Sequence, residues 1–215
     1  MAFGPVPFSY LYDKLGRQTD DGVPTVGTDT DDAVLRISIA YEVRGMPSTI
    51  SSADNATPGS GTILNQVQLT YNTFGQLSEE QQDHGGTVSG SSPKVQYGYN
   101  TGGSSSNEIR LNQLTYPNGR TIGYSYGTSG GLNDYLNRID TIQDTTSGTT
   151  DLASYTYLGL ETVVRITYPE PSVWLDLWGG TSGTFAGLDL FDRIIDQNWQ
   201  NSITTTGWIT PSFWS

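Results

Sequence analysis

The chain has 215 residues, of which 22 are acidic and 10 basic, so its formal net charge is −12. Nucleic acids and anionic membrane surfaces are bound mainly through Lys and Arg, and this charge argues against both as partners. The absence of Cys excludes a disulfide framework and thiolate metal sites, whereas 26 Gly, 13 Tyr and 5 Trp are typical of a turn-rich β protein. The length allows one sizeable domain, 1–215.

The N-terminal part of the chain carries no targeting or spanning segment that the pattern can identify. Residues 1–9 lack the charged start and continuous apolar run of a signal peptide, and no run of about 20 apolar residues occurs anywhere. The acids of 20–32 include Asp29-x-Asp31-Asp32, but this spacing lacks the glycine and distal glutamate of a calcium loop. We therefore expect a solvated loop there, and neither a metal site nor a membrane span.

Alternating apolar and polar residues then predict a series of strands separated by polar loops. The strands predicted before residue 100 cover Ala33–Tyr41, Met46–Ile50, Gln66–Tyr71, Leu77–Gln82 and Val95–Tyr99. Clusters of Ser, Asn, Pro and Gly predict loops at 51–61 and 101–106. His84, the single histidine, precedes two glycines without a catalytic motif beside it, and we interpret it as a loop residue.

The stretch Tyr116–Tyr126 states the pattern most clearly, because a turn leads directly into a strand. Pro117, Asn118 and Gly119 form a turn, and the residues after it alternate between an aromatic face and a small polar face. Further strands are predicted over Leu136–Ile142 and Thr162–Tyr168, with a polar loop at 144–150 between them.

A short motif recurs along the chain: Tyr, an acid or amide, two residues, Gly and one long side chain. It occurs as Tyr12-Asp-Lys-Leu-Gly-Arg17, Tyr41-Glu-Val-Arg-Gly-Met46 and Tyr71-Asn-Thr-Phe-Gly-Gln76. Tyrosines recur along the chain every 27 to 30 residues. A repeat of about this length indicates stacked units that share a core. We expect equivalent, mostly buried places for the tyrosines that continue this spacing, namely Tyr12, Tyr41, Tyr71, Tyr99, Tyr126 and Tyr155. We also expect positive φ at the turn glycines Gly16, Gly45, Gly75 and Gly119.

These motifs resemble the YD repeat of the RHS (rearrangement hotspot) family of bacterial surface and toxin-delivery proteins. The resemblance implies a long antiparallel sheet that spirals into a hollow shell, and an extracellular or cell-surface location. This chain is shorter than a closed shell needs and has no recognisable aspartate-rich self-cleaving segment, and we expect no effector after it. We therefore predict an all-β array of antiparallel hairpins forming an open, curved, shell-like sheet, with regular repeats over 9–157 and a divergent part over 158–215.

The resemblance assigns a structural role to the residues of the repeat motif. They are Tyr12, Asp13, Gly16, Arg17, Tyr41, Gly45, Tyr71, Gly75, Tyr116, Pro117, Asn118, Gly119, Arg120, Tyr124 and Tyr126. In the last copy, Leu188-Asp-Leu-Phe-Asp-Arg-Ile194, Asp192 stands where the glycine would be.

Two functional hypotheses follow. The first is a non-catalytic scaffold without cofactor or metal, a segment of an RHS-type protein or a small relative, whose partners are the remaining repeats of a parent protein or other copies joined through sheet edges. The second is a carbohydrate-binding or glycan-active module. It would use Trp174, Trp178 and Trp199 near Asp176 and Asp196, with an acid pair such as Asp189 and Asp192.

Overall fold

The computed structural model describes residues 8–100, 109–177 and 187–201. The strands of the N-terminal part are β1 (Ser9–Tyr12), β2 (Gln18–Gly22), β3 (Arg36–Tyr41), β4 (Pro47–Ala53), β5 (Ile63–Tyr71), β6 (Leu77–Asp83) and β7 (Lys94–Tyr99). They are followed by β8 (Leu111–Thr115), β9 (Thr121–Ser125), α1 (Leu132–Tyr135), β10 (Thr141–Asp144), β11 (Thr150–Leu158), β12 (Thr162–Tyr168), β13 (Val173–Asp176) and β14 (Asn198–Asn201).

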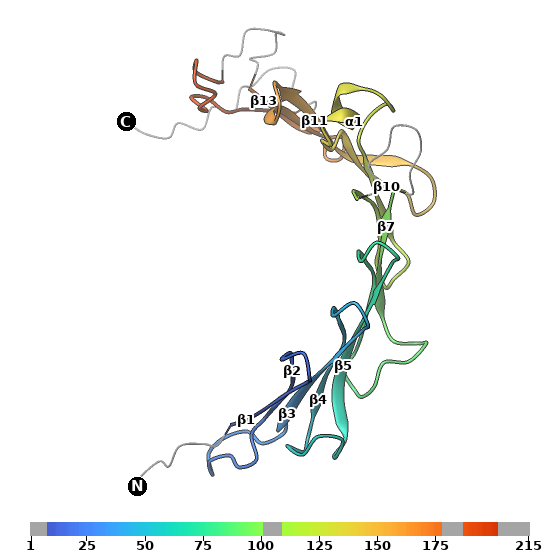
Figure 1. Ribbon diagram of the computed structural model, residues 1–215. Coiled ribbons are helices and arrows are strands. Elements are labelled where there is room, and N and C mark those ends of the chain that lie inside the picture. Colours follow the sequence, from blue (N-terminus) through green and yellow to red (C-terminus); the bar gives the residue numbers. More distant parts are fainter. Residues whose placement is uncertain (1–7, 101–108, 178–186, 202–215) are drawn as a thin grey trace. The chain divides into compact units, whose positions relative to one another are not determined.

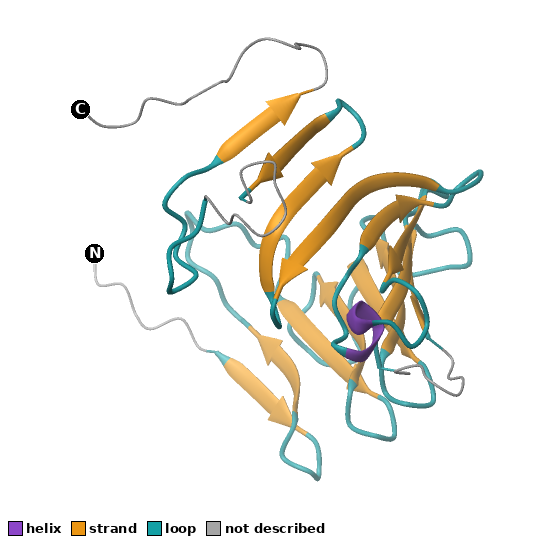
Figure 2. Ribbon diagram, turned by 90° about the horizontal axis from the view of Figure 1, so that it is seen from above, coloured by secondary structure: helices purple, strands orange, loops and turns teal. Residues whose placement is uncertain are grey.

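The strands form one open sheet in the order of the sequence, so that each strand is hydrogen-bonded to the one before and the one after it. Neighbouring strands such as β1 and β2, β3 and β4, and β11 and β12 are antiparallel. Figure 1 shows β1 to β5 side by side. Figure 2 shows that the described chain consists almost entirely of strands and loops. The predicted all-β architecture of antiparallel hairpins in an open sheet is confirmed.

The chain divides into two compact units, Met1–Tyr97 and Gly98–Ser215. The prediction of a single domain is not tested by this division. Within the part of the chain that the structure describes, the one helix, α1, has four residues, far fewer than a helix needs to cross a bilayer.

One predicted strand is wrong. Over Leu136–Ile142 the chain instead leaves α1, turns at Asn137 with a φ of 56°, and enters β10 only at Thr141. The left-handed conformation at Asn137 interrupts an extended chain, and a side-chain bond between Asn133 and Arg138 holds the turn. The strand predicted from Ala33 also begins later, at Arg36.

The core is small, because apart from α1 the described elements all belong to the one sheet and supply no second layer. The buried apolar cluster consists of Val164, Leu177 and Leu188, with Leu158 and Leu175 packed against it. For this reason five of the six tyrosines that we expected to be mostly buried are half-buried, and the sixth, Tyr12, is 60% exposed.

The prediction for the turn glycines is confirmed. Their φ angles are 77° at Gly16, 92° at Gly45, 82° at Gly75 and 83° at Gly119. Each lies in the left-handed region, which a side chain with a Cβ atom enters only at a cost.

We predict that Gly119→Ala lowers the free energy of unfolding by about 1 kcal/mol, because an added Cβ has free space but makes the left-handed backbone unfavourable. Gly90→Ala is the matched control, since its Cβ also has free space and its φ is not positive. This variant is expected to leave stability unchanged or raise it slightly. Denaturant unfolding measures both, and equal effects would show that backbone conformation is not what selects glycine at 119.

Candidate functional site

A five-residue turn recurs with the same backbone hydrogen bonds, and we call it the repeat turn. Its first N–H donates to the carbonyl of its fifth residue, and its fourth N–H donates to the carbonyl of its first. These bonds occur in 13–17, 42–46, 72–76, 116–120 and 189–193. In the first three copies the strand register shifts by one residue at the tyrosine just before the turn, which makes a bulge. The predicted motif thus corresponds to one recurring piece of backbone.

The first side chain of the repeat turn caps the turn and holds the fifth side chain. Asp13 Oδ1 accepts hydrogen bonds from the N–H groups of Leu15 and Arg17, at 2.8 and 3.0 Å, and its Oδ2 accepts from Arg17 Nε at 2.7 Å. These bonds from Arg17 and Leu15 lower the pKa of Asp13, although burial opposes them. Both oxygens of the carboxylate are therefore hydrogen-bonded within the turn.

The turn 72–76 keeps this arrangement with a pair of amides in place of the acid and the arginine. Asn72 Oδ1 accepts from Phe74 N and Gln76 N at 2.9 and 3.0 Å, and the Asn72 amide donates to Gln76 Oε1 at 2.7 Å. Where the first residue is the longer Glu42, its carboxylate pairs instead with Arg44 at 2.7 Å, and the fifth residue is the uncharged Met46. An acid is thus paired with an arginine, and an amide with an amide.

The turn 116–120 has the same backbone bonds but a different place in the sheet. It follows β8, an even-numbered strand, whereas the other repeat turns of this kind follow odd-numbered strands, so it lies at the other end of the strands that it joins. Arg120 Nε contacts Asp144 Oδ2 at 2.9 Å, and bonds from Thr146 and then Arg120 lower the pKa of Asp144 to about 2. Tyr116–Arg120 is therefore a hairpin turn that lies between copies of the Tyr-Asp motif and is not one of those copies.

Arginine side chains of one hairpin lie over tyrosine rings of the next hairpin. The guanidinium carbon of Arg17 is 4.3 Å from the ring centroid of Tyr41, and Arg110 and Arg138 lie in the same way over Tyr126 and Tyr157, at 4.2 and 4.5 Å. We call each such pair a rung.

The hydroxyl of the tyrosine completes the rung by donating to the backbone of the preceding hairpin. The hydroxyl donates to the backbone carbonyl of the residue that directly follows the last residue of the preceding turn, as Gln18 follows Arg17. The donor and acceptor pairs, each 2.6 to 2.8 Å apart, are Tyr41 and Gln18, Tyr71 and Pro47, Tyr126 and Leu111, and Tyr157 and Ile139. Each rung thus joins two hairpins that are consecutive in the sequence.

Tyr157, and not Tyr155, belongs to this series. Tyr157 has both the arginine over its ring and the register shift that marks the other tyrosines, whereas Tyr155 lies two residues earlier within β11. The sequence carries a signal for this choice, because both tyrosines occur in a Tyr-x-Tyr pair. In each pair the second tyrosine, Tyr126 or Tyr157, forms the rung. Tyr124 lies within β9, and burial raises the pKa of its hydroxyl.

Two arginines that form rungs, Arg110 and Arg138, belong to enlarged turns, and the sequence did not predict the role of Arg110. Arg110 closes a turn whose first residue is Asn100, since the Asn100 N–H donates to the Arg110 carbonyl at 3.2 Å. The Arg110 guanidinium also forms a buried ion pair with Asp134 of α1, whose other oxygen accepts from Gly130 N at 2.8 Å. The bonds from Gly130 and Arg110 lower the pKa of Asp134 against the effect of burial.

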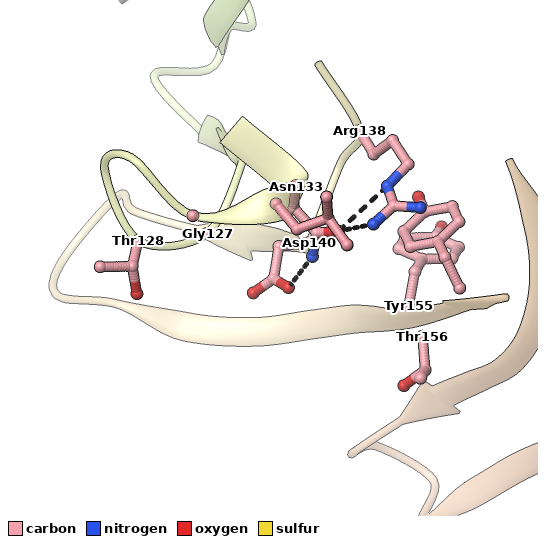
Figure 3. A pocket seen from close by; sticks show the side chains of 10 residues that line it. Gly127, Thr128, Asn133, Arg138, Asp140, Tyr155 and Thr156 are labelled. Carbon is pink, nitrogen blue, oxygen red and sulfur yellow. Dashed lines mark hydrogen bonds between the residues drawn. The ribbon is translucent and has the colours of Figure 1, made fainter. Parts of the chain in front are cut away.

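A depression of about 410 Å³ lies beside α1 and is shown in Figure 3. Its polar side chains are paired with one another: Asn133 donates to Asp140 at 2.7 Å and accepts from Arg138 at 2.6 Å. Arg138 also donates to the carbonyls of Gly159 and Leu160 at 2.7 and 3.0 Å. The charged groups of the depression are therefore satisfied by the chain itself.

The predicted tryptophan cluster is wrong for the residues that the structure describes. Trp174 is directly opposite Gln200, and Trp199 is directly opposite Leu175. Because residues alternate between faces along a strand, Trp174 and Trp199 point to opposite faces of the sheet. Trp174 Nε1 donates to Gln200 Oε1 at 2.6 Å, and Trp178 lies outside the described residues. These side chains do not form one aromatic platform.

The acids proposed for catalysis are residues of a repeat turn. Asp189 Oδ1 accepts from Phe191 N and Arg193 N at 2.8 and 3.1 Å, and its Oδ2 accepts from Arg193 Nε at 2.6 Å. Asp192 occupies the glycine position with a φ of 59°. Across residues 8–100, 109–177 and 187–201, no group of three metal-ligating side chains is close enough to hold a metal ion.

Comparison with known proteins finds similarity to solved structures and to nothing else searched. No protein-family model matches the chain, and no curated protein matches it. The chain is similar to a chain in the structure of the Photorhabdus luminescens Tc holotoxin pore, determined with a mutation in TccC3, at 12% sequence identity and a TM-score of 0.47. The similarity covers 91% of this chain and 10% of that one, so this chain spans about a tenth of that chain's length. A similarity of this degree does not identify a function.

Proposed function

We propose that the chain is a non-catalytic structural scaffold, a segment of a β-sheet built from YD-type repeats like those of the RHS family. The observation that carries the proposal is the rung. The recurring Tyr and Arg side chains direct their rings, hydroxyls and guanidinium groups to the neighbouring hairpin. A motif whose polar groups bind the sheet itself serves to join repeats.

The chemistry of the rung suits a sheet that is extended hairpin by hairpin. Each rung combines a cation–π contact, worth about 0.5–1 kcal/mol at an exposed site, with a hydrogen bond worth about 1 kcal/mol. Neither is large alone, but the tyrosine hydroxyl bond recurs from hairpin to hairpin, as in repeat arrays whose stability is a sum of neighbour terms. The partners proposed for this scaffold are the remaining repeats of a parent protein, and its proposed location is the cell surface or the extracellular space.

The glycan-active alternative has less support. A general acid in a glycosidase needs a raised pKa so that it is protonated at working pH. Burial pushes the pKa of Asp189 upward, but the hydrogen bonds from Phe191 and Arg193 outweigh it and the pKa lies below its ordinary value. Asp189 is thus suited to capping a turn and not to donating a proton.

One experiment compares the wild type with Asp189→Asn and Asp189→Ala in a screen of chromogenic glycosides and esters, together with thermal unfolding. We expect no turnover from any of the three proteins. We expect Asp189→Ala to lower Tm more than Asp189→Asn, because Asn keeps the oxygen that accepts the two N–H groups, as Asn72 does. Wild-type turnover that disappears in a folded Asp189→Asn variant would contradict the proposal.

A further inference from the structure

The described hairpins leave a tyrosine without its arginine at one edge of the sheet. Tyr12 ends β1 at the same register shift as Tyr41 and Tyr71. Among the residues that the structure describes, no guanidinium lies over its ring and no carbonyl accepts from its hydroxyl, and its side chain is 60% exposed. Tyr12 is therefore half of a rung.

An arginine without its tyrosine is found in the last repeat turn. Arg193 is held by Asp189 at 2.6 Å, just as Arg17 is held by Asp13. Its side chain is 74% exposed, against 29% for Arg17, which lies over Tyr41. The ring nearest to it in the described chain is that of its own turn, Phe191, at 5.5 Å.

The strands beside these half rungs are uncharged edge strands, to which another strand can pair. β1 and β14 are the first and last strands of the sheet order, and neither sequence, Ser-Tyr-Leu-Tyr or Asn-Trp-Gln-Asn, carries a charge. Proteins commonly protect edge strands with charged side chains, which are absent from these two. The residues next to the half rungs are apolar and exposed, namely Phe8, Tyr10, Leu11, Leu190, Phe191 and Ile194.

We propose that a second copy of this chain seats its β1 along β14, so that Arg193 lies over Tyr12 of the partner subunit and the tyrosine hydroxyl donates to the Ile194 carbonyl. This inference rests on the proposed scaffold function, because it extends the rung from neighbouring hairpins to neighbouring copies. The two surfaces are different, so the contact is head-to-tail and repeats from copy to copy, as in a ring or a fibre.

The experiment uses the full chain with Tyr12→Glu, which disables one surface, and Arg193→Glu, which disables the other. In sedimentation velocity the wild type is expected to associate with rising concentration, and more strongly at higher salt because the charge of −12 is then screened. Each variant alone is expected to remain monomeric. Mixed in equal amounts, they are expected to form a 1:1 dimer and nothing larger, since each supplies the surface that the other lacks.

Lys94→Glu is the control, because it makes the same change of charge as Arg193→Glu on β7, away from β1 and β14. It is expected to associate like the wild type. The mixing arm also shows that both edge variants are folded. A wild type that stays monomeric at every concentration and salt, or variants that associate alone as the wild type does, would overturn the inference. Such a result would leave the scaffold proposal intact, since only turnover in the substrate screen contradicts that proposal.

Discussion

Replacing Arg36 with methionine is expected to lower the free energy of unfolding by about 3 kcal/mol, because buried acceptors lose their donor. The side chain of Arg36 is 3% exposed, and its guanidinium donates to the carbonyls of Asn55 at 2.6 Å, Ser60 at 3.2 Å and Thr57. Those carbonyls belong to the loop between β4 and β5, so one side chain of β3 holds the loop.

Arg44→Met is the matched control for Arg36→Met in chemical denaturation. Both arginines contact a carboxylate and at least one backbone carbonyl: Arg36 contacts Asp20, and Arg44 contacts Glu42 and the carbonyl of Asn72. The side chain of Arg44, however, is 39% exposed. Water can replace the hydrogen bonds of an exposed arginine at little cost, and we expect a much smaller loss of stability than for Arg36→Met. Losses of equal size in the two variants would mean that water reaches the carbonyls around Arg36 and that its burial is not the cause.

Arg110→Met is expected to have an effect of similar size in the second unit. Arg110 combines a side chain that is 8% exposed, the ion pair with Asp134 and the rung to Tyr126. Its removal leaves a buried carboxylate without an opposite charge, and breaking one side of a buried pair is far more costly than losing a surface pair. We expect the Arg110 variant to lose about 3 kcal/mol of unfolding free energy.

The double variant Arg110→Met with Asp134→Leu separates the two contributions. Replacing both partners of a buried pair with apolar side chains removes the unpaired charge, so we expect most of the lost stability to return. Arg120→Met serves as the exposed control, because the Arg120 side chain is 49% exposed where it contacts Asp144. A double variant as unstable as Arg110→Met would show that the rung to Tyr126, and not the unpaired charge, accounts for the loss.

The sequence predicted the repeat turns well, because their hydrogen bonds are local. The carboxylate of Asp13 bonds residues two and four positions later, and the left-handed glycine that closes the turn is recognisable in the sequence. The paired changes of residue are equally local: Asp13 with Arg17, and Asn72 with Gln76. Such contacts can be deduced from spacing alone.

The enlarged turns show where local reasoning fails. Asn133 and Arg138 reproduce the contact of Asp13 and Arg17 at a spacing of five, and Asn133 is itself a residue of α1. Extra residues within a turn can leave its two ends in contact. They change the number of residues between the two side chains, and the sequence motif is recognised by that number. The same residues were therefore predicted to be part of a strand.

By itself the sequence determined the class of fold, the array of hairpins and the residues that close the five-residue turns, since alternation and turn chemistry act over a few residues. Only the tertiary structure decided which arginine lies over which tyrosine, that Arg36 binds carbonyls about 20 residues away, and that Trp174 and Trp199 lie on opposite faces. The physical reason is strand register. A bulge of one residue exchanges the two faces of a strand, so contacts across strands depend on a pairing that no single segment specifies.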